Sequence, residues 1–287
     1  MQPVLSELIS LLGLERLDRD LFRGHSQDLG WGAIFGGQVL GQALSAAART
    51  VHQDRAVHSL HAYFLRAGNL NLPILYQVER IRDGHSFATR RVVAVQEGEA
   101  IFSLAASFHV SEPGFDHHAQ APDVVGPEEL LSEHDLAVQL GDRLPERLRP
   151  TATRMRPIEL RPVAPRNPLR PTPMPPLRHV WLRAIDTLPD DPALHAYLLA
   201  YASDFSLLGT SLDPHGVSWL SPGMQMASLD HAMWFHRPFR MDDWLLYAIE
   251  GPSASGALGL VRGQFFDRAG RLVASVAQEG LIRLRSP

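Results

Sequence analysis

Asp204 is the residue of this sequence whose surroundings point most directly to chemistry. It is the only charged residue between Pro192 and Leu212, a stretch otherwise made of apolar and small residues. Leu194, Leu198, Tyr201 and Phe205 recur at helical spacing in that stretch, and this predicts a helix buried on nearly all sides that ends near Gly209. A carboxylate in such surroundings costs free energy unless it is paired or hydrogen-bonded. Asp204 is therefore either a cap at a break in the helix or an acid held in the interior for catalysis.

Gln278 is the second polar residue that the pattern places in the core. Alternate residues from Leu272 to Ile282 share one face of the last predicted strand, 271–283, and Gln278 is the one polar side chain among them. A buried amide needs partners for its donors and its acceptor. The residue either bonds to nearby backbone or belongs, with Asp204, to a site in the second half of the chain.

Several other chemistries are excluded by residue types that the chain lacks. It contains no cysteine and no lysine, which rules out thiolate nucleophiles, Schiff-base formation and a phosphate-binding loop with its lysine. The nucleophile-elbow motif G-x-S-x-G does not occur, and the nearest segment, 251–255, has serine in its fifth place. His58 and His61 stand three apart on a predicted strand and so point to opposite faces, and no H-x-x-x-H pair occurs. We therefore expect no metal site and no bound cofactor.

Composition places the chain among ordinary globular proteins. It has 287 residues, 45% of them hydrophobic and 20% charged, with a formal net charge of −4, which gives no reason to expect a nucleic-acid partner. The N-terminal segment lacks the basic leader of a signal peptide, and no run of 18 apolar residues occurs that would cross a membrane. We expect a cytoplasmic protein without a membrane partner.

The elements that position Asp204 and Gln278 recur in two halves. The first half predicts a short helix over 5–12, a strand over 17–26, a helix over 38–50 and strands over 57–65, 74–82, 86–96 and 100–110. The second predicts an edge strand over 158–163, a strand over 179–185, the Asp204 helix and strands over 224–237, 244–250, 256–266 and 271–283. The order indicates a tandem repeat of one α+β unit, in which an antiparallel sheet wraps a helix.

The two halves also resemble each other in their letters, and they differ where chemistry is expected. The segment that begins at His61 is similar to the one that begins at His231, and Ala106 occupies the place of Gln278. The helix over 38–50 carries no acid to match Asp204. We therefore expect one active site per chain.

A proline-rich connection separates the halves. Ten of the 22 prolines lie between Pro145 and Pro176, and residues 130–140 predict a helix within the connection. The predicted organisation is an N-terminal unit over 1–112, a connection over 113–156 and a C-terminal unit over 157–287.

The sequence as a whole resembles the acyl-CoA thioesterase II family, the double hot-dog thioesterases. The resemblance covers nearly the whole chain and rests on LFRG (21–24), FGGQV (35–39), HSLHAYFLR (58–66), DGHSF (83–87), YASD (201–204), LDHAMWFHRP (229–238), DWLLY (243–247) and AQEG (277–280). It implies two fused hot-dog units, a homo-oligomer (dimer or tetramer), and hydrolysis of acyl-CoA to a fatty acid and coenzyme A without a metal or cofactor. The family's catalytic triplet falls on Asp204, Ser228 and Gln278.

The resemblance also suggests how the triplet works. Asp204 is expected to accept a proton from the attacking water, while Ser228 and Gln278 hold that water in line. The turn at Gly36 and Gly37, at the start of the first buried helix, is a candidate for binding the oxyanion, although tight packing explains those glycines equally well. Two alternatives stay open: a hot-dog hydratase or dehydratase that uses the adjacent Asp230 and His231, and a non-catalytic acyl-CoA-binding protein.

Overall fold

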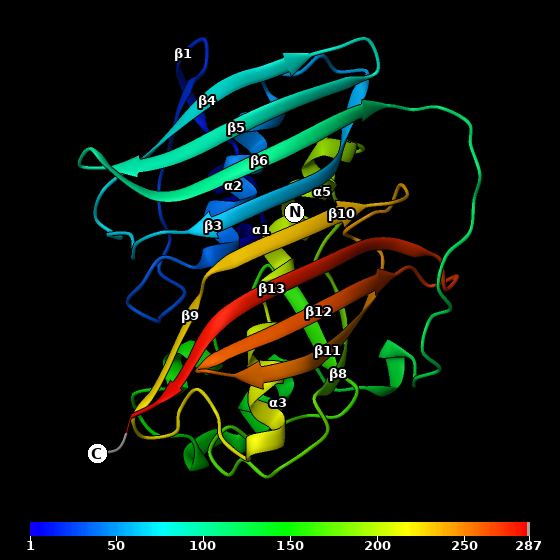
Figure 1. Ribbon diagram of the computed structural model, residues 1–287. Helices are drawn as coiled ribbons and strands as arrows, with labels where there is room; N and C mark the ends of the chain where they lie inside the picture. The colour runs from blue at the N-terminus through cyan, green and yellow to red at the C-terminus, as the bar shows by residue number, and fades with distance from the viewer. Residues whose placement is uncertain (286–287) are drawn as a thin grey trace.

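The protein, described here for residues 1–285 by a computed structural model, is built on a single antiparallel sheet that curves around two helices (Figure 1). The first half supplies strands β1 (Glu15–Asp18), β2 (Leu21–Gly24), β3 (Arg55–Phe64), β4 (Ile74–Asp83), β5 (Phe87–Gln96) and β6 (Glu99–Val110). The second half supplies β7 (Ile158–Pro162), β8 (Leu177–Ala184), β9 (Met224–Ser228), β10 (Asp230–Phe235), β11 (Leu245–Ser255), β12 (Leu258–Phe266) and β13 (Leu272–Leu284). The predicted α+β architecture, with one sheet-and-helix unit in each half, is confirmed.

The halves join at the centre of the sheet, where β3 and β10 pair as neighbours. The strand order is β1-β2-β4-β5-β6-β3-β10-β13-β12-β11-β8-β7, and β9 pairs with the end of β13. Counted outward from the shared centre, the strands of the first half (β3, β6, β5, β4, β2, β1) and of the second half (β10, β13, β12, β11, β8, β7) follow the same relative order. This is the arrangement expected of a duplicated unit. The predicted edge strand over 158–163 is confirmed, because β7 ends the order.

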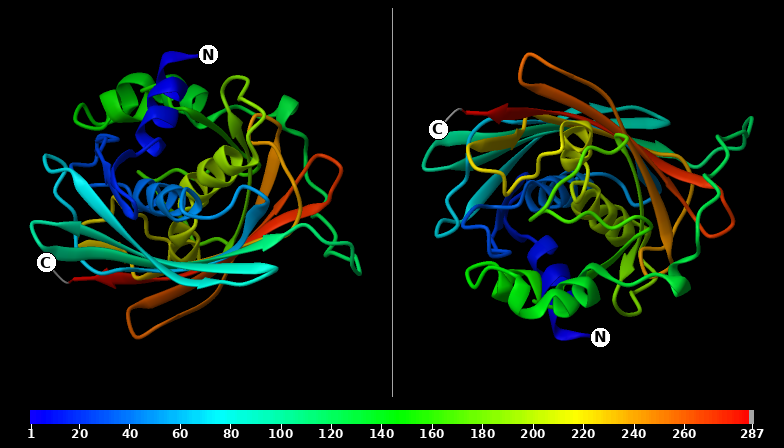
Figure 2. Two further views of the ribbon diagram at one scale, coloured as in Figure 1. Left: turned by 90° about the horizontal axis from the view of Figure 1, so that it is seen from above. Right: turned by 90° about the horizontal axis from the view of Figure 1, so that it is seen from below.

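The main helices, α2 (Gly36–Ala48) and α5 (Pro192–Ser203), lie side by side in the hollow of the sheet (Figure 2). They run antiparallel, since Gly37 lies against Tyr201 while Gly41 lies against Tyr197. A Cβ at Gly37 would overlap the carbonyl oxygen of Tyr201, so these glycines allow close approach of the two backbones. The contact brings the start of α2 next to the end of α5, where Asp204 lies.

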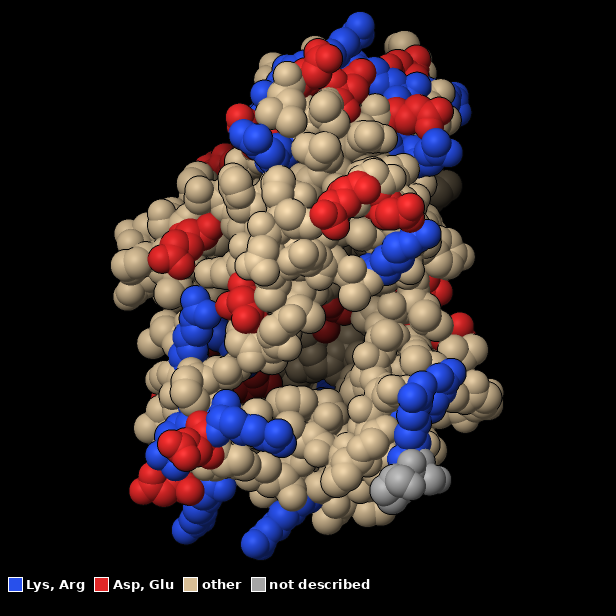
Figure 3. Space-filling model, turned by 90° about the vertical axis from the view of Figure 1, so that its left-hand side faces the viewer, with Lys and Arg blue, Asp and Glu red and all other residues tan. Residues whose placement is uncertain are grey.

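Smaller elements cover the open side of the helices. Helix α1 (Pro3–Leu12) packs on α2, and α3 (Glu133–Leu140) and α4 (Arg149–Ala152) follow the extended connection between the halves, with the 3₁₀ turns η1 (Pro127–Glu129) and η2 (Gly141–Arg143) (Figure 2). The face of the molecule in Figure 3 is hollowed near its middle, and side chains other than Arg, Asp and Glu surround most of that hollow. No helix within residues 1–285 is long and apolar enough to cross a membrane.

Three boundaries differ from the sequence prediction. The helix expected to run to Gly209 ends at Ser203, and a 3₁₀ helix, η3 (Leu208–His215), follows after Ser206, whose φ is 63°. The strand expected over 224–237 is divided at Leu229, because its first part pairs with β13 and its second part with both β13 and β3. The strand expected over 17–26 is instead the hairpin of β1 and β2.

The segments that begin at His61 and His231 are similar in sequence, but the two histidines do not occupy equivalent positions in the sheet. His231 pairs with Ala62, and His61 pairs with Ala232, so successive residues on these strands face opposite sides of the sheet. His231 is fully buried, whereas His61 is exposed and stacks edge-on against Trp234.

Candidate active site

Asp204 lies at the junction of the two helices. It is the C-cap residue of α5, and its Oδ2 accepts a hydrogen bond of 3.0 Å from the backbone N–H of Gly37 in the first turn of α2. The carboxylate therefore faces the positive end of one helix dipole and the negative end of another. Asp204 thus stands at a helix break and is half-buried, and its role in catalysis stays a prediction.

The surroundings of Asp204 raise its pKa above the ordinary aspartate value of 3.8, because burial disfavours the charged carboxylate. Positive charge on His231, the Gly37 N–H and the Gln278 side chain act in the opposite direction and offset part of the rise. The result is a carboxylate that is more basic than an exposed aspartate, which is the property needed in a general base.

A continuous hydrogen-bond chain lies beside Asp204. The Gln278 Nε2 donates to Ser228 Oγ at 2.8 Å, and the Gln278 Oε1 lies 2.6 Å from His231 Nδ1. The other ring nitrogen, Nε2 of His231, lies 2.9 Å from Ser203 Oγ, and the backbone carbonyl of Ser203 accepts a 2.8 Å bond from the hydroxyl of Tyr247. Five different elements thus meet at one network: α5, β9, β10, β11 and β13.

The proton positions in this chain follow from its donors and acceptors. An amide oxygen only accepts, so Nδ1 of His231 donates to Gln278. Burial lowers the pKa of His231, although Asp204 partly opposes this. The Ser203 hydroxyl, which lies 2.9 Å from His231 Nε2, also lies 2.9 Å from the Ala200 carbonyl, and its single proton serves one of these two acceptors at a time. His231 therefore fixes which way the Gln278 amide faces, with its NH₂ group directed to Ser228.

The structure brings the predicted site residues together. Gln278 is 1% exposed and bonds directly to Ser228, and both Gly36 and Gly37 lie against the Asp204 carboxylate. Asp230 and His231 do not form a pair, since Asp230 instead accepts the backbone N–H of Glu279 at 2.8 Å. No group of three or more His, Asp or Glu side chains that could hold a metal ion occurs among residues 1–285.

Sequence reasoning named His231 only in the hydratase alternative, and it did not name Ser203 as part of the site. The alternation along β10 was available as a signal, because His231 and Met233 share the inward face and both are fully buried. The same pattern fits a structural core histidine equally well, and only the contacts with Gln278 and Ser203 tell the two apart.

The fold is a double hot-dog fold, in which an antiparallel sheet wraps the two helices that meet at Asp204. A conserved protein of unknown function with a hot dog fold from Alicyclobacillus acidocaldarius superposes with a TM-score of 0.77 over 98% of this chain and 99% of its own, at 16% identity, which supports the fold alone.

Two family patterns match the chain: the acyl-CoA thioesterase pattern over residues 149–281 and the acyl-CoA thioesterase N-terminal domain over residues 26–109. Acyl-CoA thioesterase 2 of Haemophilus influenzae is 43% identical over 99% of both chains. The structure of acyl-CoA thioesterase II TesB2 from Mycobacterium marinum superposes with a TM-score of 0.79 at 43% identity, covering 97% of this chain and 99% of that one. The chain belongs to the acyl-CoA thioesterase family.

Proposed function

We propose that this protein hydrolyses acyl-CoA thioesters to a free fatty acid and coenzyme A, with Asp204 as the general base. The observation that carries the proposal is the Asp204 carboxylate, held against the N-terminus of α2 and beside the Gln278–Ser228 pair. Membership of the family and the name of the Haemophilus relative support the same reaction.

The reaction proceeds by direct attack of water on the thioester carbonyl. Asp204 accepts one proton from the water as its oxygen bonds to the carbonyl carbon, and Ser228 and Gln278 orient that water. The tetrahedral intermediate then collapses, the carbon–sulfur bond breaks, and the departing sulfur takes up the proton from Asp204. No covalent enzyme intermediate and no cofactor is needed for this balance.

The two glycines at the start of α2 have separate roles in this proposal. The N–H of Gly37 is engaged by the Asp204 carboxylate, so it holds the base. The N–H of Gly36 belongs to the first residue of α2, where backbone donors lack partners within the helix. We assign Gly36 as the oxyanion donor, because an anion near this end is also favoured by the helix dipole.

The hydratase alternative finds less support in the site. A histidine that moves protons to a substrate needs a free ring nitrogen, and both ring nitrogens of His231 bond to protein side chains, Gln278 and Ser203. A non-catalytic binding protein would not need a carboxylate with a raised pKa at the end of a buried helix. The cytoplasmic location, the assembly into dimers or tetramers and the division into units 1–112, 113–156 and 157–287 stay predictions.

The deciding experiment incubates the purified protein with acyl-CoAs of several chain lengths and follows free CoA with a thiol reagent. We expect thiol release at a rate that Asp204→Asn abolishes, and equal release of the fatty acid by mass spectrometry. Loss of an enoyl-CoA without thiol release would identify a hydratase instead. Tight binding without turnover of any acyl-CoA would identify a binding protein.

A further inference from the structure

The active site has a counterpart at the opposite end of the helix pair. Because the two halves order their strands identically from the sheet centre, each site residue has an equivalent in the first half. Gln278 on β13 pairs with Val261, and Ala106 on β6 pairs in the same way with Arg90. Ser228 pairs with the residue two positions after Gln278, and Val57 pairs with the residue two positions after Ala106. The counterpart of the Asp204 C-cap is Arg49, the C-cap of α2.

The counterpart has lost the catalytic side chains and gained positive charge. The places of Asp204, Ser228 and Gln278 are taken by Arg49, Val57 and Ala106, so no base and no water-holding pair remains. This agrees with one active site per chain.

Arg90 fills the interior of the counterpart and is 1% exposed. Its Nε donates to Thr50 Oγ1 at 2.8 Å, and Nη2 donates to the Thr50 carbonyl at 3.0 Å and to Asp83 Oδ1 at 2.5 Å. Nη1 donates to the carbonyls of Arg82 and Thr89. All its donors are used, so Arg90 is a structural cation that neutralises the negative end of α2 rather than a free ligand-binding group.

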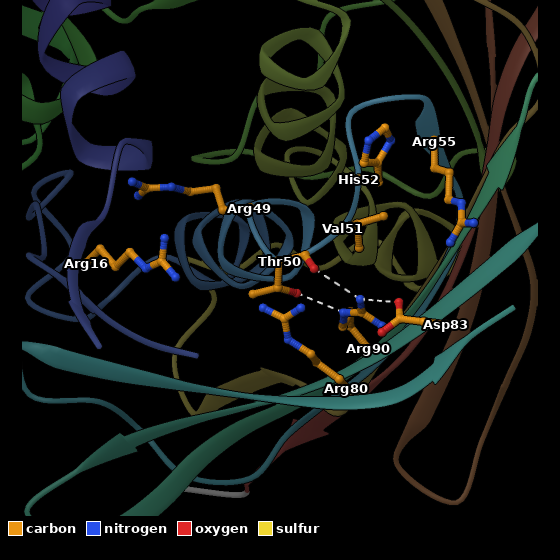
Figure 4. A pocket seen from close by; sticks show the side chains of 9 residues that line it. All are labelled: Arg16, Arg49, Thr50, Val51, His52, Arg55, Arg80, Asp83 and Arg90. Carbon is orange, nitrogen blue, oxygen red and sulfur yellow. Dashed lines mark hydrogen bonds and ion pairs between the residues drawn. The ribbon is translucent and has the colours of Figure 1, made fainter. Parts of the chain in front are cut away.

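A cavity of about 470 Å³ opens to solvent over this buried cation (Figure 4). It is lined by Arg16, Arg49, Thr50, Val51, His52, Arg55, Arg80, Asp83 and Arg90. Arginines make up more than half of the lining residues, and Val51 is the one apolar residue among them.

The cavity carries a surplus of positive charge. Five arginines contribute to its lining, with Asp83 as the single carboxylate among the lining residues. Two further carboxylates adjoin the cavity: Asp20 pairs with Arg80, and Asp54 pairs with His52 and lies 3.8 Å from Arg55. No carboxylate within residues 1–285 forms an ion pair with Arg16 or Arg49, which bond only to backbone carbonyls. The chain as a whole is negative, at −4, so the clustering runs against its overall charge.

We propose that this arginine cavity is a second ligand site, which binds a phosphate-bearing small molecule. Guanidinium groups match phosphate oxygens through paired N–H donors, and Arg16 and Arg49 keep unused donors for this purpose. The site lies at the far end of α2 from Asp204, about 20 Å away at 1.5 Å per residue for 13 residues. The phosphate comes either from a separate nucleotide-type ligand or from the nucleotide end of an acyl-CoA whose thioester occupies the active site.

Titration calorimetry with inorganic pyrophosphate tests the site without relying on catalysis. We expect one equivalent to bind, more weakly as salt is raised, and Arg16→Gln/Arg49→Gln to weaken binding by about tenfold or more. Since Arg49 also bonds the Leu14 carbonyl and covers the Phe22 ring, Arg16→Gln/Arg80→Gln serves as a second variant that leaves those contacts intact. The matched control is Arg143→Gln/Arg147→Gln, two exposed arginines outside the cavity.

The proposal is overturned if wild type does not bind pyrophosphate, or if folded cavity variants bind it as tightly as the control. A second measurement identifies the source of the phosphate and rests on the proposed thioesterase activity. If the phosphate belongs to the substrate, Arg16→Gln/Arg80→Gln raises KM for acyl-CoA at least about tenfold and leaves KM for acyl-pantetheine, which lacks the nucleotide, unchanged. Unchanged KM for both, with weakened pyrophosphate binding, identifies a separate ligand.

Discussion

Replacing Asp204 by asparagine should separate catalysis from stability. The substitution keeps the shape of the side chain, and its amide oxygen can still accept the Gly37 N–H, but it removes the base. Loss of a general base lowers kcat by roughly 10²–10⁴-fold, which corresponds to about 2.7–5.4 kcal/mol of transition-state stabilisation. Turnover should therefore nearly vanish.

The same variant should be more stable than wild type at neutral pH. The fold raises the pKa of Asp204, so it disfavours the ionised form, and this cost is complete above the folded-state pKa. As the pH falls through that pKa, protonation relieves the cost, and below the unfolded value near 3.8 the advantage of the asparagine is gone. Removing a destabilised active-site charge commonly gains about 0.5–2 kcal/mol, a few degrees in Tm for a chain of this size.

Two measurements on purified variants check these expectations: thiol release from acyl-CoA and thermal unfolding at pH 7 and at pH 4. Asp142→Asn, at a carboxylate that is 98% exposed, is the matched control and should change neither quantity. The reasoning fails if Asp204→Asn turns over at close to the wild-type rate. It also fails in part if the variant unfolds at a lower temperature than wild type at pH 7, because the carboxylate would then be a stabilising cap.

Four further predictions concern the groups around the base. His231→Ala should lower kcat by roughly 10–100-fold with little change in KM, because the amide that it orients becomes free to turn, and a comparable rise in KM would show a general structural loss. Ser228→Ala should lower kcat while Ser228→Thr, which keeps the hydroxyl, retains most of it; equal loss in both would remove the hydroxyl from the mechanism. Gly36→Ala should lower kcat, since its Cβ would stand 2.8 Å from Asp204 Oδ2, whereas Gly114→Ala meets nothing within 4 Å and should be silent in the same assay. The acid limb of the kcat/KM profile should lie above pH 3.8, with activity lost as the pH falls through the raised pKa of Asp204, and a profile flat down to that pH would contradict the assignment.

The sequence alone identified the site residues that stand out as single polar side chains in an apolar pattern. Asp204 and Gln278 are single polar residues in apolar patterns, and the structure places Gln278 in the hydrogen-bond chain and Asp204 beside it. Ser228 could be reached only through the family resemblance, because β9 has no clearly apolar face. The contacts of His231 with Gln278 and Ser203 were missed because these partners lie 47 and 28 residues away in the chain, which no local pattern shows.

The end of the Asp204 helix was also decided by contacts distant in sequence. The local letters favour a helix up to Gly209, yet the carboxylate at 204 turns to the N–H of Gly37, 167 residues away, and Ser206 adopts a left-handed backbone. Helix propensity depends on local sequence only, so it does not include a hydrogen bond to the other half of the molecule that favours ending the helix.

The opposite charges at the ends of the two helices give a physical reason to expect one catalytic centre in this duplicated fold. A helix C-terminus favours cations, and the first half follows this rule, with Arg49 at the C-cap of α2 and buried Arg90 bonded to the Thr50 carbonyl just beyond it. The second half breaks the rule by placing Asp204 at the C-cap of α5, where burial raises the pKa of the carboxylate, and this suits the base role that we propose. The N-terminus of α2 limits that cost through the Gly37 N–H, so the first half supports the base even though it has none of its own. We therefore expect catalysis by Asp204 to depend on the antiparallel contact of the two helices, which the glycines at positions 37 and 41 permit.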